Sequence, residues 1–314
     1  MFLLYVKTVN FLKNFIILYS LFFSNFSISE TFDKELETGK NYLFGINEVK
    51  NEKLAIHWLK ISHKNGNNEA TYLLGYCYTF DICDQNNPNK GTELLETSFN
   101  NGKIKAGYDL GIYFLKSKNI SKAKNYFLKS QLFPLSAYNL GLLYINRNNQ
   151  FHNLQTGVKF LSLALKFSPL KSNNNLHYPE DYLGNIYLTN QFNVQNFYVA
   201  HDWFYYSSIL NSPYGLFNLA NIYANISFSS LSRPIAYALY LKSSNIHTNK
   251  ALKTKSKTKG NFLFNSLNQE EKEIAKEFSR LELGALLNLV NPNIKHSLSA
   301  LKLQLKNDFN LSGI

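Results

Sequence analysis

Serine and lysine residues three positions apart are the feature of this chain nearest to catalytic chemistry, because a lysine can activate a serine as a nucleophile. The spacing occurs four times, at Ser121/Lys124, Ser168/Lys171, Ser256/Lys259 and Ser299/Lys302. The further motifs that accompany Ser-x-x-Lys in β-lactam chemistry are absent from the sequence. Four copies in a chain this rich in serine and lysine indicate chance, so a weak hydrolase or carbohydrate-handling protein is a minor alternative.

The histidines and cysteines do not predict a metal site. His57 and His63 stand six apart, which directs them to different faces of a helix. Cys77 and Cys83 have no nearby histidine that would complete a zinc site. They could close a small loop through a disulfide in an oxidising compartment, or remain two buried thiols. No glycine-rich phosphate loop or nucleophile elbow occurs either, so we expect no enzymatic activity, metal or cofactor.

One phrase recurs five times and predicts the architecture. It consists of leucine, then glycine or alanine, then two variable residues and an aromatic residue. The copies are Leu74-Gly75 with Tyr78, Leu110-Gly111 with Phe114, Leu140-Gly141 with Tyr144, Leu183-Gly184 with Tyr187, and Leu219-Ala220 with Tyr223. In the first copy Ala70, Leu74 and Tyr78 stand four apart, which places them on one stripe of a helix. A helical phrase with a period of 30 to 43 residues is typical of an α-solenoid.

A second phrase gives each repeat a second helix, in which a small residue precedes an aromatic residue or leucine by three positions. In three copies a helix breaker follows this small residue after eleven positions, from Ala55 to Gly66, from Gly91 to Gly102 and from Ala123 to Pro134. The glycine of the first phrase lies in mid-helix at a cost of up to about 1 kcal/mol, so we expect the paired helix to approach it closely. The pattern predicts an all-α chain: a right-handed α/α solenoid of about six helix pairs with a C-terminal helical cap.

The first 29 residues are typical of an export signal. Lys7 and Lys13 form a positive region, an apolar stretch follows over 15–23, and small residues precede Glu30. Nine apolar residues are too few to span a bilayer, which needs about 20. We therefore expect a cleaved signal peptide over 1–29 and an exported chain, periplasmic or secreted. An uncleaved N-terminal membrane anchor is the alternative.

The repeat pattern covers 30–249 and then fails. Five lysines alternate with small residues in the segment 250–261, which predicts a solvated basic linker. Contact of these lysines with anionic lipid or an acidic partner is the alternative. Beyond the linker, 262–314 should form capping helices over the open end of the solenoid, with Asn268 as a candidate N-cap.

The composition indicates an ordered chain and gives little support to nucleic-acid binding. Charged residues make up 17% of the chain and aromatic residues 15%, which is not the composition of a disordered protein. The formal net charge is +12, and basic proteins can bind nucleic acid or anionic lipid. Most lysines are scattered among the asparagine, isoleucine, phenylalanine and tyrosine that AT-rich codons encode. A biased genome explains much of the excess, so we expect no nucleic-acid partner.

Together these phrases resemble the Sel-one-like repeat (SLR) family, a relative of the tetratricopeptide solenoids with longer repeats. The resemblance covers roughly residues 33–246 and is carried best by Ala55-x-x-Trp58, Gly66, Ala70, Leu74-Gly75 and Tyr78. It implies an exported or membrane-associated adaptor that scaffolds protein complexes, in a bacterial cell envelope. A secreted factor that acts on host cells and an adaptor of endoplasmic-reticulum quality control are the alternatives.

Two positions of the first phrase lie off the core stripe, three before and one after the glycine or alanine; we call them the −3 and +1 positions. In related solenoids that side of the helix lines the concave face. The positions hold Tyr72, Tyr76, Tyr108, Ile112, Tyr138, Leu142, Asp181, Asn185, Phe217 and Asn221. Exposed aromatic residues would favour a protein or peptide partner, so we predict partner binding at Tyr72, Tyr76, Tyr108, Tyr138 and Phe217. Packing of the −3 tyrosines on the next repeat is the alternative.

Overall fold

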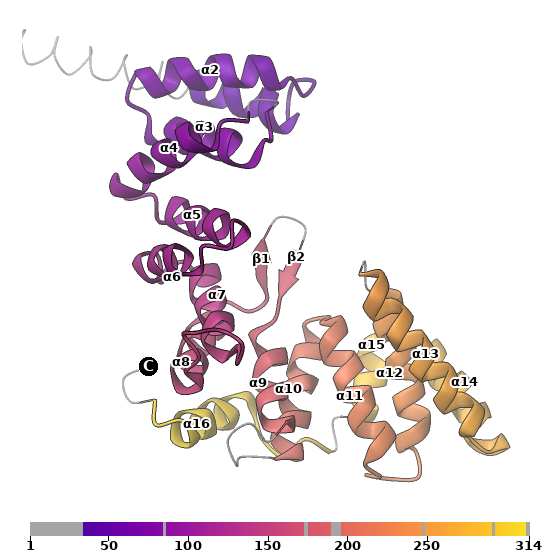
Figure 1. Ribbon diagram of the computed structural model, residues 1–314. Coiled ribbons are helices and arrows are strands. Elements are labelled where there is room, and N and C mark those ends of the chain that lie inside the picture. Colours follow the sequence, from indigo (N-terminus) through magenta and orange to yellow (C-terminus); the bar gives the residue numbers. More distant parts are fainter. Residues whose placement is uncertain are drawn as a thin grey trace, which may run out of the picture. The chain divides into compact units, whose positions relative to one another are not determined.

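Figure 1 shows the computed structural model of the chain. It describes residues 34–83, 86–172, 175–189, 196–246, 249–290 and 293–311, with the side chains of 171, 172 and 175 left out. The expected signal peptide over 1–29 lies outside the described residues. The chain divides into two compact units, residues 1–133 and 134–314, so the solenoid expected as one domain over 30–249 is shared between them.

The described part of the first unit contains three helix pairs. A helix over 34–44 precedes α2 (Glu52–Lys64), and the next pairs are α3 (Asn68–Phe80) with α4 (Pro88–Asn100), and α5 (Ile104–Lys116) with α6 (Ile120–Lys129). The members of the second and third pairs pack closely on each other, and α3 also contacts α5 of the next pair. This is the packing of a solenoid, in which each repeat contacts its neighbours.

The second unit contains three more pairs and a helical C-terminal region. The pairs are α7 (Pro134–Ile145) with α8 (Leu154–Leu165), α9 (Pro179–Leu188) with α10 (Phe197–Ile209), and α11 (Pro213–Asn225) with α12 (Ser232–Ile246). The region that follows holds α13 (Lys250–Ser266), α14 (Gln269–Arg280), α15 (Leu283–Val290) and α16 (Leu298–Asp308). The expected six helix pairs and the all-α solenoid class are therefore confirmed.

A recurring asparagine starts the second helix of five pairs. These N-caps are Asn51, Asn87, Asn119, Asn153 and Asn196, each four residues before the small residue of the second phrase. Each side chain accepts a hydrogen bond from a backbone N–H of the first helical turn, which would otherwise lack a partner. In the second pair, the Asn87 backbone N–H also donates to the carbonyl of Tyr78, the aromatic residue of the first phrase, over 3.2 Å. A backbone hydrogen bond thus connects the aromatic residue of the first phrase to the N-cap of the second helix.

The mid-helix glycines lie where the paired helix approaches closely, as expected. A Cβ atom at Gly75 would lie 2.9 Å from the backbone nitrogen of Leu95 on α4. At Gly184 it would lie 2.6 Å from the ring of Phe204 on α10. Ala220 occupies the same place in the fifth copy and is fully buried. The packing of the pairs therefore offsets the helix cost of these glycines.

A short β-ribbon departs from the all-α expectation. Strands β1 (Leu170–Ser172) and β2 (Asn175–His177) pair antiparallel between α8 and α9, with Leu170 opposite His177. The ribbon follows the end of α8 and precedes Pro179, the first residue of α9. It places Leu176 and His177 beside the next repeat, where both line a cavity.

The expected basic linker over 250–261 is wrong, because this segment belongs to the 17-residue helix α13. Leu252, Ser256, Gly260 and Leu263 recur at helical spacing and are buried, and α13 packs against α12. The lysines occupy the other faces of the helix and hide this stripe in the sequence. A helix that is polar around most of its surface but keeps one narrow apolar contact is easily mistaken for a linker.

The C-terminal helices only partly cap the solenoid. Helices α14 and α15 pack on α12, the last repeat helix, and Asn268 forms a capping box with Glu271 at the start of α14. Helix α16 instead returns to the earlier pairs of the same unit and lies beside α8, α9 and α10 (Figure 1). Gln155 donates to the Phe309 carbonyl over 2.8 Å, and the Tyr187 hydroxyl donates to Asp308 over 2.7 Å. None of the described helices is long and apolar enough to cross a membrane.

Candidate functional site

The −3 and +1 positions separate cleanly by burial. All five −3 residues, Tyr72, Tyr108, Tyr138, Asp181 and Phe217, are at most 7% exposed. All five +1 residues, Tyr76, Ile112, Leu142, Asn185 and Asn221, are half-buried. The −3 tyrosines therefore pack within the protein, which agrees with the alternative prediction that they are packing residues. The accessible surface on this side of the first helices lies at the +1 residues.

The packing partners of the −3 aromatic residues come mainly from later in the chain. The ring of Tyr108 lies 6.2 Å from that of Phe127 and 5.1 Å from that of Phe133, measured between centroids. Phe217 lies 5.7 Å from Tyr240. These contacts position the first helices of the repeats and leave little ring surface for a partner.

An aromatic ladder on α3 includes a −3 and a +1 residue of the first unit. Tyr72, Tyr76 and Phe80 stand four apart, with ring centroids separated by 6.1 Å and 4.9 Å. Lysines of α5 cover the ladder: Lys105 Nζ lies 4.7 Å from the Tyr72 centroid and 5.2 Å from that of Tyr76. Lys116 Nζ lies 5.3 Å from the Phe80 centroid. Lysine ammonium groups at this distance are attracted to the negative ring faces.

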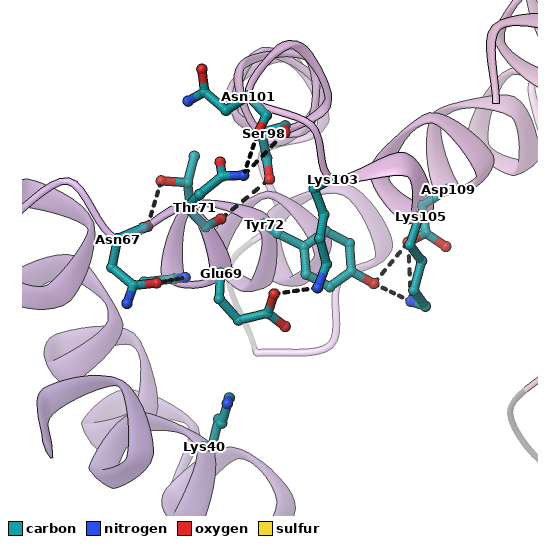
Figure 2. Close-up of polar contacts among 12 residues, drawn as sticks. Lys40, Asn67, Glu69, Thr71, Tyr72, Ser98, Asn101, Lys103, Lys105 and Asp109 are labelled. Carbon is teal, nitrogen blue, oxygen red and sulfur yellow. Dashed lines mark hydrogen bonds and ion pairs between the residues drawn. The ribbon is translucent and has the colours of Figure 1, made fainter. Parts of the chain in front are cut away.

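Polar contacts lock the inner end of this ladder (Figure 2). The Tyr72 hydroxyl donates to Asp109 Oδ2 over 2.8 Å, and Lys105 donates to the same oxygen over 3.3 Å and to the Tyr72 hydroxyl. Lys103 pairs with Glu69 and lies over the Tyr72 ring, 5.2 Å from its centroid. Burial raises the pKa of the Asp109 carboxyl, while Lys105 and the Tyr72 hydroxyl act against this shift. Burial and Asp109 both raise the pKa of Tyr72, which keeps its proton as a donor.

Cys77 and Cys83 form a disulfide at the end of α3. Both side chains are at most 2% exposed, and Asp81 between them takes a left-handed backbone conformation with φ of 53°. The bond closes a tight loop after the aromatic ladder. Of the two expectations, a disulfide or two buried thiols, the structure has the disulfide.

The second unit contains a cavity of about 310 Å³ that is lined by residues at three of the −3 and +1 positions. Its lining residues are Tyr138, Leu176, His177, Tyr178, Asp181, Tyr182, Asn185 and Tyr214. The ring of Tyr138 lies 5.8 Å from that of Tyr182 at an angle of 76°, and 5.1 Å from that of His177. Tyr182 and Asn185 are half-buried and Tyr214 is 45% exposed, so the cavity has an accessible rim.

Asp181 supplies the carboxylate of this cavity. The hydroxyls of Ser207 and Ser212 donate to its two oxygens, the latter over 2.6 Å. The Asn185 side-chain amide donates to its backbone carbonyl over 2.8 Å. Burial raises the pKa of Asp181 to about 7, and the two serine hydroxyls limit the rise. The carboxylate is therefore held in place with its charge only partly compensated.

Helix α13 covers the −3 and +1 positions of the last repeat. Lys255 and Lys259 place their Nζ atoms 5.2 Å and 5.5 Å from the Phe217 centroid. Lys259 also donates to Asn221 Oδ1 over 2.7 Å. Two lysines of α13 thus contact the aromatic −3 residue and the polar +1 residue of the last repeat.

A buried polar cluster on α10 was not anticipated from the sequence. Asp202 is fully buried and accepts from the backbone N–H groups of Lys295 and His296 over 3.1 Å and 2.8 Å. The Nδ1 atoms of His296 and His201 lie 2.9 Å and 2.8 Å from its carboxylate. The cluster fastens the segment before α16 to the repeats. One aspartate beside a run of four aromatic residues gives no recognisable pattern in the sequence.

The aromatic run itself is structural. Trp203, Phe204 and Tyr205 are at most 8% exposed, and the half-buried Tyr206 donates to the carbonyl of His296 over 3.4 Å. All four residues therefore pack within the second unit. Within the described part of the chain, no group of three or more histidine, cysteine, aspartate or glutamate residues could hold a metal ion.

Paired helices, a recurring leucine-glycine phrase and a half-buried +1 surface define the class of an α/α-solenoid repeat scaffold. The Sel1 repeat family matches residues 36–67, 68–103, 104–130 and 134–166. These matches correspond to the first four helix pairs, so these four repeats are Sel1 repeats and the predicted SLR resemblance is confirmed for this part of the chain. The pairs α9–α10 and α11–α12 continue the same architecture beyond the matched residues.

Solved structures support the same fold. One is the crystal structure of a protective antigen present in uropathogenic Escherichia coli strains, described as displaying an SLR fold. It is 15% identical, with a TM-score of 0.57, covering 92% of this chain and 72% of that one. A Sel1 repeat protein from Oxalobacter formigenes is 17% identical with a TM-score of 0.57, covering 79% of this chain and 98% of that one. No curated protein matches this chain in sequence.

Proposed function

We propose that this protein is an exported adaptor of a bacterial cell envelope, which binds protein partners through the +1 side of its repeats and catalyses no reaction. Sel1 repeats generally mediate protein–protein interactions. The observation that carries the proposal is the division of the repeat surface, in which the −3 residues are packed and the +1 residues Tyr76, Ile112 and Leu142 stay half-buried. Within each unit, partly exposed side chains at these positions suit a protein segment that lies over the repeats of that unit.

Crosslinking in cells tests the adaptor. A tagged chain and a variant with Tyr76→Ser, Ile112→Ser and Leu142→Ser would be crosslinked, purified and compared by mass spectrometry. We expect a specific protein to be recovered with the native chain and lost with the variant. A control variant, Leu54→Ser with Leu303→Ser, alters two exposed leucines elsewhere, 38% and 61% exposed, and should keep the partner. Equal recovery by all three chains would contradict binding at the +1 residues.

The exported location is supported by the Cys77–Cys83 disulfide, because such bonds persist in oxidising compartments and are rare in the cytosol. It also rests on the signal-like segment 1–29. The measurement is intact mass after expression in a bacterial host, with and without reduction and alkylation. We expect a chain beginning near Glu30 whose two cysteines react only after reduction. A full-length chain with freely alkylated thiols would contradict export.

A secreted factor that meets host cells is the second candidate. One structural neighbour is described as a protective antigen of uropathogenic strains, and this supports a role outside the cell. Detection of the chain in culture supernatant would favour this candidate. Retention in the periplasmic fraction would favour the envelope adaptor.

A further inference from the structure

We propose that the cavity between Tyr138, Tyr182, Asp181 and Asn185 binds the ammonium group of a lysine side chain from a partner's peptide segment. The inference deepens the proposed function by naming the chemistry that one site of the adaptor recognises. In two other repeats, lysines of the chain itself contact the −3 and +1 residues.

Two other repeats have their −3 and +1 residues covered by lysines of the chain itself. Lys105 lies over Tyr72 and Tyr76, the −3 and +1 residues of the first copy, at 4.7 Å and 5.2 Å. Lys259 lies over Phe217 and donates to Asn221, the −3 and +1 residues of the fifth copy. The two arrangements come from unrelated segments, so lysine is the side chain that these positions accommodate.

At the fourth copy, the cavity combines a +1 asparagine with aromatic rings from Tyr138 and Tyr182, and its described lining contains no lysine. Asn185 is the counterpart of Asn221, and its amide nitrogen already donates to the Asp181 carbonyl. Its Oδ1 atom is therefore the group that corresponds to the acceptor of Lys259. Tyr138 and Tyr182 offer aromatic rings at the cavity, and the residues that line it include no lysine.

Asp181 makes this cavity the most suitable of the three for a cation. An ionised carboxylate has about four acceptor sites on its two oxygens, and the Ser207 and Ser212 hydroxyls use two. The described lining contains one carboxylate and no lysine or arginine, in a chain of net charge +12. The carboxylate and the aromatic rings of the lining attract an ammonium group locally, although the net charge of the chain is positive.

The dimensions suit a side chain rather than a folded domain. The cavity has a volume of about 310 Å³. Its carboxylate belongs to Asp181, which is 6% exposed, and Tyr214 and Asn185 form its rim. Lysine carries its charge on a flexible four-carbon stem, which can pass an aromatic rim and place the ammonium group at the floor. A peptide segment lying over the +1 residues would supply such a stem.

Selection from a random heptapeptide phage library on the purified chain tests the assignment at pH 8, where Asp181, with a pKa of about 7, is mostly ionised. We expect lysine to be enriched at one position of the selected peptides. The enrichment should disappear with Asp181→Asn and with Tyr182→Leu. Glu180→Gln removes the neighbouring buried carboxylate, which bonds Ser168 and does not line the cavity, and should keep the enrichment.

A matched peptide pair gives the quantitative test. One selected peptide and its analogue with norleucine in place of lysine, which keeps the stem and removes the ammonium group, would be titrated by calorimetry. We expect roughly tenfold weaker binding of the analogue to the native chain, the size of one desolvated cation–π or ion-pair contact. Both peptides should bind Asp181→Asn equally. Equal binding of both peptides to the native chain would overturn the proposal, as would selection of arginine or acidic residues.

One further variant covers the case in which the substitutions disturb folding. Asn185→Lys, at a half-buried rim residue, would place an internal ammonium group in the cavity, as Lys259 does in the last repeat. It should remove lysine selection while keeping the circular dichroism and melting temperature of the native chain. Persistent lysine selection by this folded variant would overturn the proposal. If crosslinking in cells recovers a partner that Asp181→Asn does not affect, the cavity assignment alone is overturned. If lysine is selected from the library but no partner is found in cells, the adaptor function alone is overturned.

Discussion

Asp181 is a buried carboxyl whose ionisation opposes folding. Its pKa is about 7 in the folded chain against an ordinary 3.8, because burial disfavours the charged form. Between pH 4 and 7 the unfolded chain releases this proton and the folded chain keeps it. The contribution of Asp181 to stability is therefore greatest at and below pH 4, falls as the pH rises to 7, and is constant above.

Asp181→Asn should remove this pH dependence. The shift of about three pKa units corresponds to a few kcal/mol at most, so we expect the variant to gain stability relative to the native chain between pH 4 and 7. Urea unfolding at a series of pH values measures the difference. Glu180→Gln is the comparison. Burial also raises the pKa of the Glu180 carboxyl, so the contribution of Glu180 to stability also falls as the pH rises. A stability difference that does not change with pH would contradict the burial of an ionisable Asp181.

The repeat glycines can be tested one residue at a time. Gly184→Ala would place a methyl group 2.6 Å from the Phe204 ring, and we expect a loss of about 1–3 kcal/mol from overpacking. Gly284 on α15 has no atom within 4 Å of a new Cβ, so Gly284→Ala should gain up to about 1 kcal/mol from helix propensity. Urea denaturation of both variants gives the comparison. Similar changes in both would refute the close approach of α9 and α10.

At the scale of elements, the sequence predicts the helix pairs well because two local constraints recur along the chain. The glycine, alanine and aromatic positions indicate close helix packing, and the glycine and proline helix breakers indicate where the helices end. The asparagine N-caps were an available further pattern, since each precedes the small residue of the second phrase by four positions. The ribbon of β1 and β2 was not predictable, because strands of three residues are too short to show a strand pattern.

Helix α13 gives an element-scale prediction. Hydrogen exchange should show protected amides over 250–266, whereas a solvated linker would exchange within seconds. Leu252→Ser should raise the exchange rate along the helix because Leu252 is 6% exposed against the rest of the unit. Lys253→Ser alters an exposed neighbour and should leave the rates unchanged. Fast exchange in the native chain would restore the linker interpretation.

At the scale of the molecule, the sequence could place the −3 and +1 residues but not their exposure. Tyr72 has the same position in its repeat as Asp181, and both are buried by side chains from the following pair. The cavity lining also includes Tyr178, Tyr182 and Tyr214, which hold no special place in either phrase. Burial of these residues depends on contacts between helices that are far apart in sequence, and a single sequence does not show them.

The Asp202 cluster gives a prediction for the C-terminal return of the chain. Asp202→Ala would leave the amides of Lys295 and His296 without their acceptor, and hydrogen bonds to a charged group contribute about 1.5–3 kcal/mol each. We expect faster proteolysis within 293–309 and a loss of at least about 3 kcal/mol in urea unfolding. Lys295→Ala keeps the backbone N–H and should resemble the native chain. Unchanged proteolysis of Asp202→Ala would show that other contacts hold α16.

The return of α16 also determines when the second unit can fold. Solenoid repeats contact near neighbours, so they can form one after another as the chain is made. The contacts from Gln155 to Phe309 and from Tyr187 to Asp308 span 154 and 121 residues, and they exist only after the last helix has been synthesised. The first unit can therefore be complete while the ribosome is still adding the second. Gln155 on α8 and Tyr187 on α9 gain these contacts only after α16 has been synthesised, so their helices lack part of their packing until then.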